Sequence, residues 1–134
     1  MKETQIEEQI LSFLQARGGL VLKIPSTGYF DAKKKVFRKQ VSKFVRRGIS
    51  DIFYIENGKT YFFEVKSVKK HEYIKRHLDS IMASGGIGLN KDRKHIFEQG
   101  LFLFDVIGCD GHGGFVSSVD DVLGIINKAL SRRG

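Results

Sequence analysis

The chain has 134 residues, of which 41% are hydrophobic and 28% charged, with one proline and one cysteine. This length predicts one soluble globular domain covering residues 1–134 and leaves no room for a second. No apolar run is long enough to span a bilayer, the acidic N-terminus is unlike a signal peptide, and Cys109 has no possible disulfide partner. We therefore expect a cytoplasmic protein without a membrane anchor, in which Cys109 is a small buried or inert thiol.

The first predicted elements are a helix over residues 4–17 and a short strand over residues 20–24. The helix carries an apolar stripe that includes Ile6 and Ile10, and Gly18-Gly19 ends it. Thr4 is the expected cap, with Glu7 as its capping-box partner. Glu3 and Glu7 both fall on or beside the apolar stripe, so each is either a capping residue or part of a site.

A strongly basic segment follows the only proline. The net charge of +8 is concentrated in residues 33–47, which hold no acidic side chain and are interleaved with aromatic residues. Such a segment attracts a polyanion and predicts nucleic-acid binding, although a merely solubilising surface is the alternative. Its basic residues are Lys33, Lys34, Lys35, Arg38, Lys39, Lys43, Arg46 and Arg47.

Two apolar segments, residues 52–55 and 61–65, flank Asn57-Gly58 and predict a hairpin of two central strands. Asp51 precedes the first strand and Glu64 lies near the end of the second, so antiparallel pairing lets the two carboxylates meet. Two adjacent carboxylates repel unless a cation joins them, and hard oxygen ligands suit Mg²⁺ or Mn²⁺. Lys66 points the same way as Glu64. The alternative is a turn residue followed by a solvated strand face.

The sequence after Ser67 predicts a basic helix over residues 68–82, a glycine-rich linker over 83–90 and a helix over 92–107. A strand over residues 113–117 and a last helix capped by Ser118 complete the chain. Gln99 lies on the inward stripe of the second of these helices, where an amide needs a partner. The four histidines are too far apart in sequence to predict a histidine metal or acid–base site.

These residues, taken in order, resemble the virus-type replication-repair nucleases, the VRR-NUC family of the PD-(D/E)XK nuclease superfamily. The resemblance covers most of the chain. It includes the N-terminal helix with Glu3, the Gly48-Ile49-Ser50-Asp51 and Phe63-Glu64-Val65-Lys66 motifs, Gln99, and the ending at residues 114–122. It implies an α/β, restriction-endonuclease-like fold, in which α-helices flank a mixed β-sheet. The basic segment 69–90 is longer than the usual connection in the family.

The resemblance also implies hydrolysis of DNA with Mg²⁺ or Mn²⁺. Asp51, Glu64 and the carbonyl of Val65 would hold the metal, and Lys66 would orient the attacking water. The helical glutamate is Glu3 or Glu7, and Gln99 corresponds to a helical glutamine near the metal. Short members resemble junction nucleases, so we expect a homodimer that resolves Holliday junctions, with branched DNA as partner. The alternatives are a flap or single-strand nuclease and a catalytically silent DNA-binding module.

Overall fold

The structure is a computed structural model that describes residues 1–25, 29–31, 36–38 and 46–131, with the backbone alone at 29–31 and 36–38. Its helices are α1 (Glu3–Arg17), α2 (Val68–Ala83), α3 (Lys91–Gly108) and α4 (Val119–Ser131). Its strands are β1 (Leu20–Lys23), β2 (Tyr29–Asp31), β3 (Val36–Arg38), β4 (Ile52–Glu56), β5 (Lys59–Val65) and β6 (His112–Val116). Strands β2 and β3 pair with each other in a separate two-stranded sheet.

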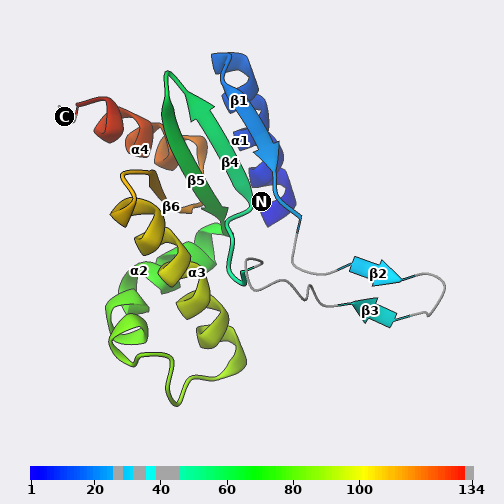
Figure 1. Cartoon of the computed structure of the whole chain (residues 1–134), viewed down its shortest axis with the longest axis vertical. Coiled ribbons are helices and arrows are strands. Elements are labelled where there is room, and N and C mark those ends of the chain that lie inside the picture. Colours follow the sequence, from blue (N-terminus) through cyan, green and yellow to red (C-terminus); the bar gives the residue numbers. More distant parts are fainter. Residues whose placement is uncertain (26–28, 32–35, 39–45, 132–134) are drawn as a thin grey trace.

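Four strands form the main sheet, in the order β1-β4-β5-β6. The pairs β1–β4 and β4–β5 are antiparallel, whereas β5 and β6 run parallel. Helices lie on either side of this sheet (Figure 1). The fold is therefore mixed α/β, with a mixed sheet flanked by helices, which is the restriction-endonuclease-like arrangement that the sequence predicted.

The predicted hairpin is confirmed. Asn57 and Gly58 both have positive φ, 51° and 75°, which is the backbone of a type I′ turn. This turn matches the twist of the flanking strands and fixes their register, with Ile52 opposite Phe63. Strands β4 and β5 are the two central strands of the sheet, as their apolar sequences indicated.

One face of the sheet lies under α1 and α4 and forms the main core. The strands contribute Ile52, Tyr54, Tyr61, Phe63, Val65 and Val116, all fully buried. The helices contribute Ile6, Ile10 and Leu14 from α1 and Val122, Ile126 and Ala129 from α4. Because each large apolar side chain gains about 1.5–3 kcal/mol on burial, this layer supplies most of the stability of the sheet.

The opposite face carries Phe62 and Glu64 and packs against α3. The rings of Phe62 and Phe102 meet edge to face, with centroids 4.9 Å apart. Helices α2 and α3 lie against each other beyond the end of β5 (Figure 1) and share a second apolar cluster of Ile74, Ile81 and Ile96. Phe115 of β6 packs against this second cluster and is the register partner of Glu64. The end of β5 therefore lies where the two apolar clusters adjoin.

Three details bear on the sequence predictions. Helix α1 begins at Glu3 with Lys2 as its N-cap, so Thr4 is not the cap. The Gln5 side chain accepts a hydrogen bond from the Lys2 N–H at 2.9 Å, which closes the first turn earlier than predicted. Cys109 is exposed rather than buried, because it follows the last residue of α3. Among the described helices, none combines the length and apolar character that a membrane span requires.

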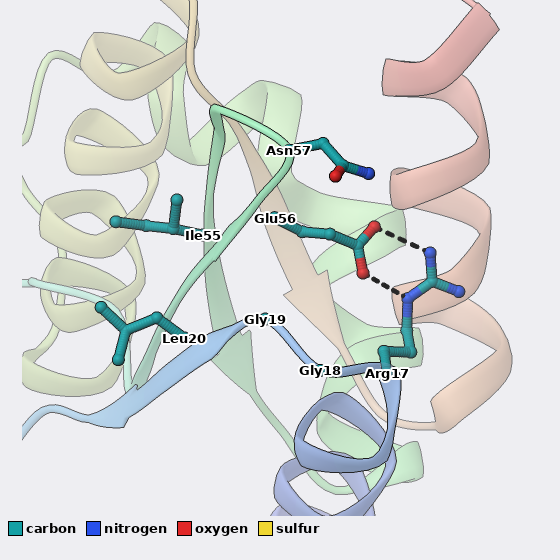
Figure 2. A pocket seen from close by; sticks show the side chains of 7 residues that line it. All are labelled: Arg17, Gly18, Gly19, Leu20, Ile55, Glu56 and Asn57. Atoms are coloured by element: carbon teal, nitrogen blue, oxygen red, sulfur yellow. Dashed lines mark hydrogen bonds and ion pairs between the residues drawn. The ribbon is translucent and has the colours of Figure 1, made fainter.

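A partly exposed ion pair joins the end of α1 to the end of β4. The Arg17 guanidinium donates two hydrogen bonds of 2.8 Å to the Glu56 carboxylate (Figure 2). The Tyr54 hydroxyl donates a third, of 2.7 Å. Glu56 is 11% exposed, and the hydrogen bonds from Arg17, followed by that from Tyr54, lower its pKa. The pair lines a pocket of about 590 Å³ at the end of β4 remote from Asp51.

Glu56→Gln is expected to destabilise the fold without touching the Asp51 end of the sheet. The substitution leaves Arg17 with only one neutral acceptor, so we expect a loss of about 1–3 kcal/mol in urea denaturation at neutral pH. The loss should shrink as the pH falls below 4.5, the usual pKa of the carboxyl group, because the depressed pKa gives stability that disappears once Glu56 is protonated. Glu72→Gln is the control. Glu72 is 60% exposed and makes only a 3.6 Å pair with Lys75, so less than about 0.5 kcal/mol is expected. A smaller loss for Glu56→Gln than for Glu72→Gln would contradict the assignment.

Candidate active site

The structure brings Asp51 and Glu64 together at the start of β4 and the end of β5. The register of the hairpin continues beyond Ile52–Phe63, so Asp51 lies opposite Glu64 on the α3-facing side of the sheet. The backbone N–H of Val65 donates to Asp51 Oδ2 at 2.8 Å, which fixes the aspartate against the second strand. The predicted meeting of the two carboxylates is therefore present, whereas their role stays a prediction.

Glu64 is buried and holds a proton in the absence of a cation. Only 3% of the surface of this residue is exposed to solvent. Burial raises the pKa of Glu64 far above the usual 4.5, and the hydrogen bond to Asp51 and the charge of that aspartate raise it further. The positive charge of Lys66 lowers the pKa of Glu64 somewhat, whereas the negative charge of Glu3 raises it further. A protonated Glu64 thus donates a hydrogen bond to the Asp51 carboxylate, and a cation would take the place of that proton.

Lys66 lies directly after β5 and is largely buried. It is 7% exposed, and its ammonium group makes no hydrogen bond or ion pair with any described residue. Its backbone N–H donates to the Val116 carbonyl at 2.8 Å, which extends the β5–β6 pairing to this position. Its positive charge lies near Glu64 and would attract an anion that approaches the two carboxyl groups.

Glu64 Oε1 is one of four buried polar atoms that have no partner among the described residues. Within the described part of the chain, such atoms are Ser50 Oγ, Tyr61 OH, Glu64 Oε1 and Gln99 Oε1. Tyr61 belongs to the main core, whereas Ser50 and Glu64 belong to the hairpin site. Native proteins leave few buried polar atoms unpaired, and such atoms commonly mark where an ion or ligand binds.

The oxygen ligands fit a hydrated Mg²⁺ or Mn²⁺. Asp51 and Glu64 would supply two carboxylate ligands, whereas the described residues contain no group of three or more His, Cys, Asp or Glu side chains that could hold a metal ion. Mg²⁺ commonly binds through one or two carboxylates and keeps several waters. The unpartnered Glu64 Oε1 is one free ligand, and the carbonyl of Val65 is the third ligand that the resemblance implies.

The backbone of α3 at Gln99 lies against the loop that precedes Asp51. Gly48, in the loop before Asp51, lies so close to α3 that an added Cβ would sit 2.6 Å from the Glu98 carbonyl and 2.8 Å from the Gln99 nitrogen. The side-chain nitrogen Nε2 of Gln99 lies 3.1 Å from Nε2 of His95. The described residues show no direct contact between Gln99 and either carboxylate. The loop contact nevertheless places Gln99 beside the segment that carries Asp51.

The two helical glutamates have different surroundings. The charge of Glu3 acts on Glu64 and raises the pKa of that residue. Glu7 is instead paired with Lys23, with 2.8 Å between Oε1 and Nζ. The charge of Asp51 also acts on Lys23, the partner of Glu7, so the choice between Glu3 and Glu7 stays a prediction.

Two residues of the predicted basic segment have described side chains. Arg46 pairs with Asp105 at 2.6 Å and lies over the Phe102 ring at 5.5 Å, so it anchors the loop before Asp51 to α3. Arg47 is exposed. The remaining predicted residues lie outside the described side chains: these are Lys33, Lys34, Lys35, Arg38, Lys39 and Lys43.

His71 forms a contact that sequence reasoning missed. Its Nδ1 lies 2.8 Å from Ser117 Oγ and 3.4 Å from Asp121 Oδ2, and the ring is buried. Burial lowers the pKa of His71, against the opposing charge of Asp121. A neutral His71 therefore joins α2 to the β6–α4 connection, next to the Val116 carbonyl that holds Lys66. No local pattern signals this contact, because 46 residues separate His71 from Ser117.

Comparisons with protein-family models, with curated proteins and with solved structures give no match. The function is therefore inferred from the site itself.

Proposed function

We propose that the protein is a Mg²⁺- or Mn²⁺-dependent endodeoxyribonuclease with a PD-(D/E)XK site of the VRR-NUC type. The observation that carries the proposal is the approach of Asp51 to the buried Glu64 and to the Val65 N–H, with Lys66 directly after the same strand. A buried carboxyl group next to the half-buried Asp51 carboxylate is costly to place without a function. A cation and a phosphate would together neutralise Asp51, Glu64 and Lys66.

The residues have distinct roles in this proposal. Asp51, Glu64 and the Val65 carbonyl hold the cation, which when bound lowers the pKa of water and offsets charge on the phosphate. Lys66 binds a phosphate oxygen or orients the attacking water. Glu3 supports the site through its charge, as its effect on Glu64 suggests. Gln99 acts from α3, where its unpartnered Oε1 can accept a hydrogen bond from a bound water.

Branched DNA is the substrate that we favour, and a Holliday junction above all, cut by a homodimer. A two-fold dimer presents two equivalent sites to the two strands of a four-way junction. The net charge of +8 supports a polyanionic substrate. A catalytically silent binding module is disfavoured, because in the absence of a cation the Asp51 carboxylate would repel phosphates and the protonated Glu64 would give them no positive charge to bind.

Asp51→Asn and Lys66→Met are expected to lower cleavage by about 10²–10³-fold or more, while binding in EDTA is retained. The assay compares four-way junction, flap, duplex and single-stranded DNA, each with Mg²⁺, with Mn²⁺ and with EDTA. Matched controls are Asp79→Asn and Lys75→Met, which make the same chemical changes at exposed positions of α2. Sedimentation equilibrium reports the mass of the assembly.

Each result has a defined reading. Cleavage of the junction in preference to the flap supports resolvase activity, and the reverse preference supports the flap nuclease. Binding without cleavage in any metal defeats the nuclease assignment. Equal cleavage by Asp51→Asn and Asp79→Asn would show that the hairpin carboxylates are not the site.

A further inference from the structure

Strand β6 forms one edge of the main sheet, and its outer side has no strand partner in the described part of the chain (Figure 1). The opposite edge strand, β1, ends in the exposed Lys23, and Pro25 follows two residues later. Lysines and prolines at an edge prevent pairing with another chain. Strand β6 contains no lysine, acidic residue or proline, so its edge can accept a further strand. Its sequence is His112-Gly113-Gly114-Phe115-Val116.

A groove runs along this edge between α3 and α4. Its volume is about 190 Å³, and we call it the β6-edge groove. The two helices approach the strand closely because Gly113 and Gly114 have no side chains. An added Cβ would lie 3.1 Å from Leu103 of α3 at Gly113, and 3.1 Å from Ile125 of α4 at Gly114. The residues that line the groove include Ile107, Gly111, Gly113, Ile125, Lys128 and Ala129.

Helix α3 extends sideways beyond β6. Phe102 packs on β5, and Leu103, the next residue around the helix, lies beside β6. Ile107, about one turn after Leu103, lines the groove, and Phe104 is turned further in the same direction, away from β5. Ile107 is 44% exposed and Phe104 is 51% exposed. The open edge is therefore bordered by two large apolar side chains that the described residues leave largely uncovered.

The charges at the groove balance each other, in a chain whose net charge is +8. Among the described residues, Lys128 is the only Lys, Arg, Asp or Glu that lines the groove. Exposed Asp110 directly precedes Gly111, another lining residue. One cation and one anion on each copy are complementary across a two-fold axis, where each can meet the opposite charge of the other copy. DNA, by contrast, would find no excess of positive charge here.

We propose that a second copy of the chain occupies the β6-edge groove, with the two β6 strands paired antiparallel about a two-fold axis. The inference rests on the proposed function in that it assigns the interface of the homodimer named there. Phe104 and Ile107 of each copy pack against the groove of the other copy. The same surface thus supplies both the projecting side chains and the hollow, as a two-fold interface requires. The two four-stranded sheets become one continuous sheet.

This pairing leaves room for both copies of α3. Because α3 lies over β5 and β6, its counterpart would be two inter-strand spacings away, which is about 10 Å. That is the usual distance between the axes of packed helices. The two-fold axis is perpendicular to the sheet, so the α3-facing sides of both copies point the same way. Both Asp51–Glu64 sites would then face one DNA molecule, with the two β5 strands about 14 Å apart.

The test is the association state of the full-length protein in the absence of DNA and metal, measured by sedimentation equilibrium. The unaltered chain should be a dimer. Ile107→Lys should raise the dimer Kd at least about 30-fold, because the two-fold axis buries two lysines in an apolar contact. Leu22→Lys is the matched control, since Leu22 is 46% exposed on the other edge strand, and Kd should stay within about threefold. Phe104→Lys is a second variant and should act like Ile107→Lys.

Amide hydrogen exchange tests the strand pairing itself. Exchange at the outward N–H groups of β6 should slow as the protein concentration rises through Kd, whereas exchange in β1 should not change. Ile107→Lys should remove this dependence while its circular dichroism stays that of the folded protein. A monomer at every concentration, or a dimer weakened by Leu22→Lys and not by Ile107→Lys, would overturn the proposal.

Failure of this inference and failure of the proposed function can be told apart. A dimer with protected β6 amides that cuts no DNA would defeat the nuclease assignment and leave the interface standing. A monomer that cuts DNA through Asp51 and Glu64 would do the reverse.

Discussion

Glu64→Gln is expected to abolish metal-dependent cleavage and to make the metal-free protein more stable. Glutamine has the shape of protonated glutamic acid and can donate to Asp51, yet it carries no charge that must be buried. Because burial and Asp51 raise the pKa of Glu64, ionising this side chain in the fold is unfavourable. A gain of at least about 1.4 kcal/mol in denaturation at neutral pH is the expected size.

The sign of the pH dependence follows from the raised pKa. The folded protein holds the Glu64 proton to higher pH than the unfolded chain does. Its contribution is therefore full below the usual pKa of 4.5 and is lost as the pH rises toward the folded-state value. The stability difference between Glu64→Gln and the unaltered protein should grow over this range. Mg²⁺ should reverse it by stabilising only the unaltered protein, increasingly at higher pH, with release of a proton.

Buried His71 titrates in the opposite direction, but it is present in both proteins and cancels in the comparison. Its pKa is lowered, so its neutral form stabilises the fold above the usual 6.5 and that contribution is lost on acidification. Thermal denaturation in EDTA and in Mg²⁺ across the pH range separates these effects. A metal-free Glu64→Gln variant that is less stable than the unaltered protein at neutral pH would show that Glu64 is not held as the acid.

Gly48→Ala is expected to displace the loop before Asp51 and to cost both stability and cleavage. Gly48 has φ of 78°, and an added Cβ would overlap backbone atoms of Glu98 and Gln99 at 2.6–2.8 Å. Backbone atoms of a helix cannot swing aside as a flexible side chain can. The strain of positive φ costs about 1–2 kcal/mol, and with the overlap the total should exceed about 3 kcal/mol.

Gly58→Ala is the matched control for this substitution. Gly58 has φ of 75°, almost the same as Gly48, but its added Cβ would have no atom within 4 Å. Only the strain of about 1–2 kcal/mol is then expected. Urea denaturation compares the two variants, and cleavage of DNA under conditions where both are folded should fall only for Gly48→Ala. Equal losses would indicate that the approach of the loop to α3 does not matter for Asp51.

The hairpin and its carboxylates could be predicted because the information is local. Asn57-Gly58 specifies the turn, the alternation of β5 separates Val65 from Glu64, and the register follows from both. The burial of Glu64 could not be predicted from the local pattern, because an alternating strand with a charged residue fits a solvated face equally well. The basic segment 33–47 could be predicted from composition alone. The ion pair between Lys70 and Asp92 could not, because the two residues lie 22 positions apart without any shared pattern.

Side chains on neighbouring positions of β5 point to opposite faces, and this has a consequence for the length of the Asn57-Gly58 turn. A slip of one residue between β4 and β5 would set Val65 beside Asp51 and drive the charge of Glu64 into the layer of Ile52 and Phe63. The turn lies at the opposite end of the β4–β5 ladder from the carboxylates, yet it fixes the register and so determines which residues face each other at the carboxylate end. Loop length at one end of this sheet is thus a chemical constraint at the other.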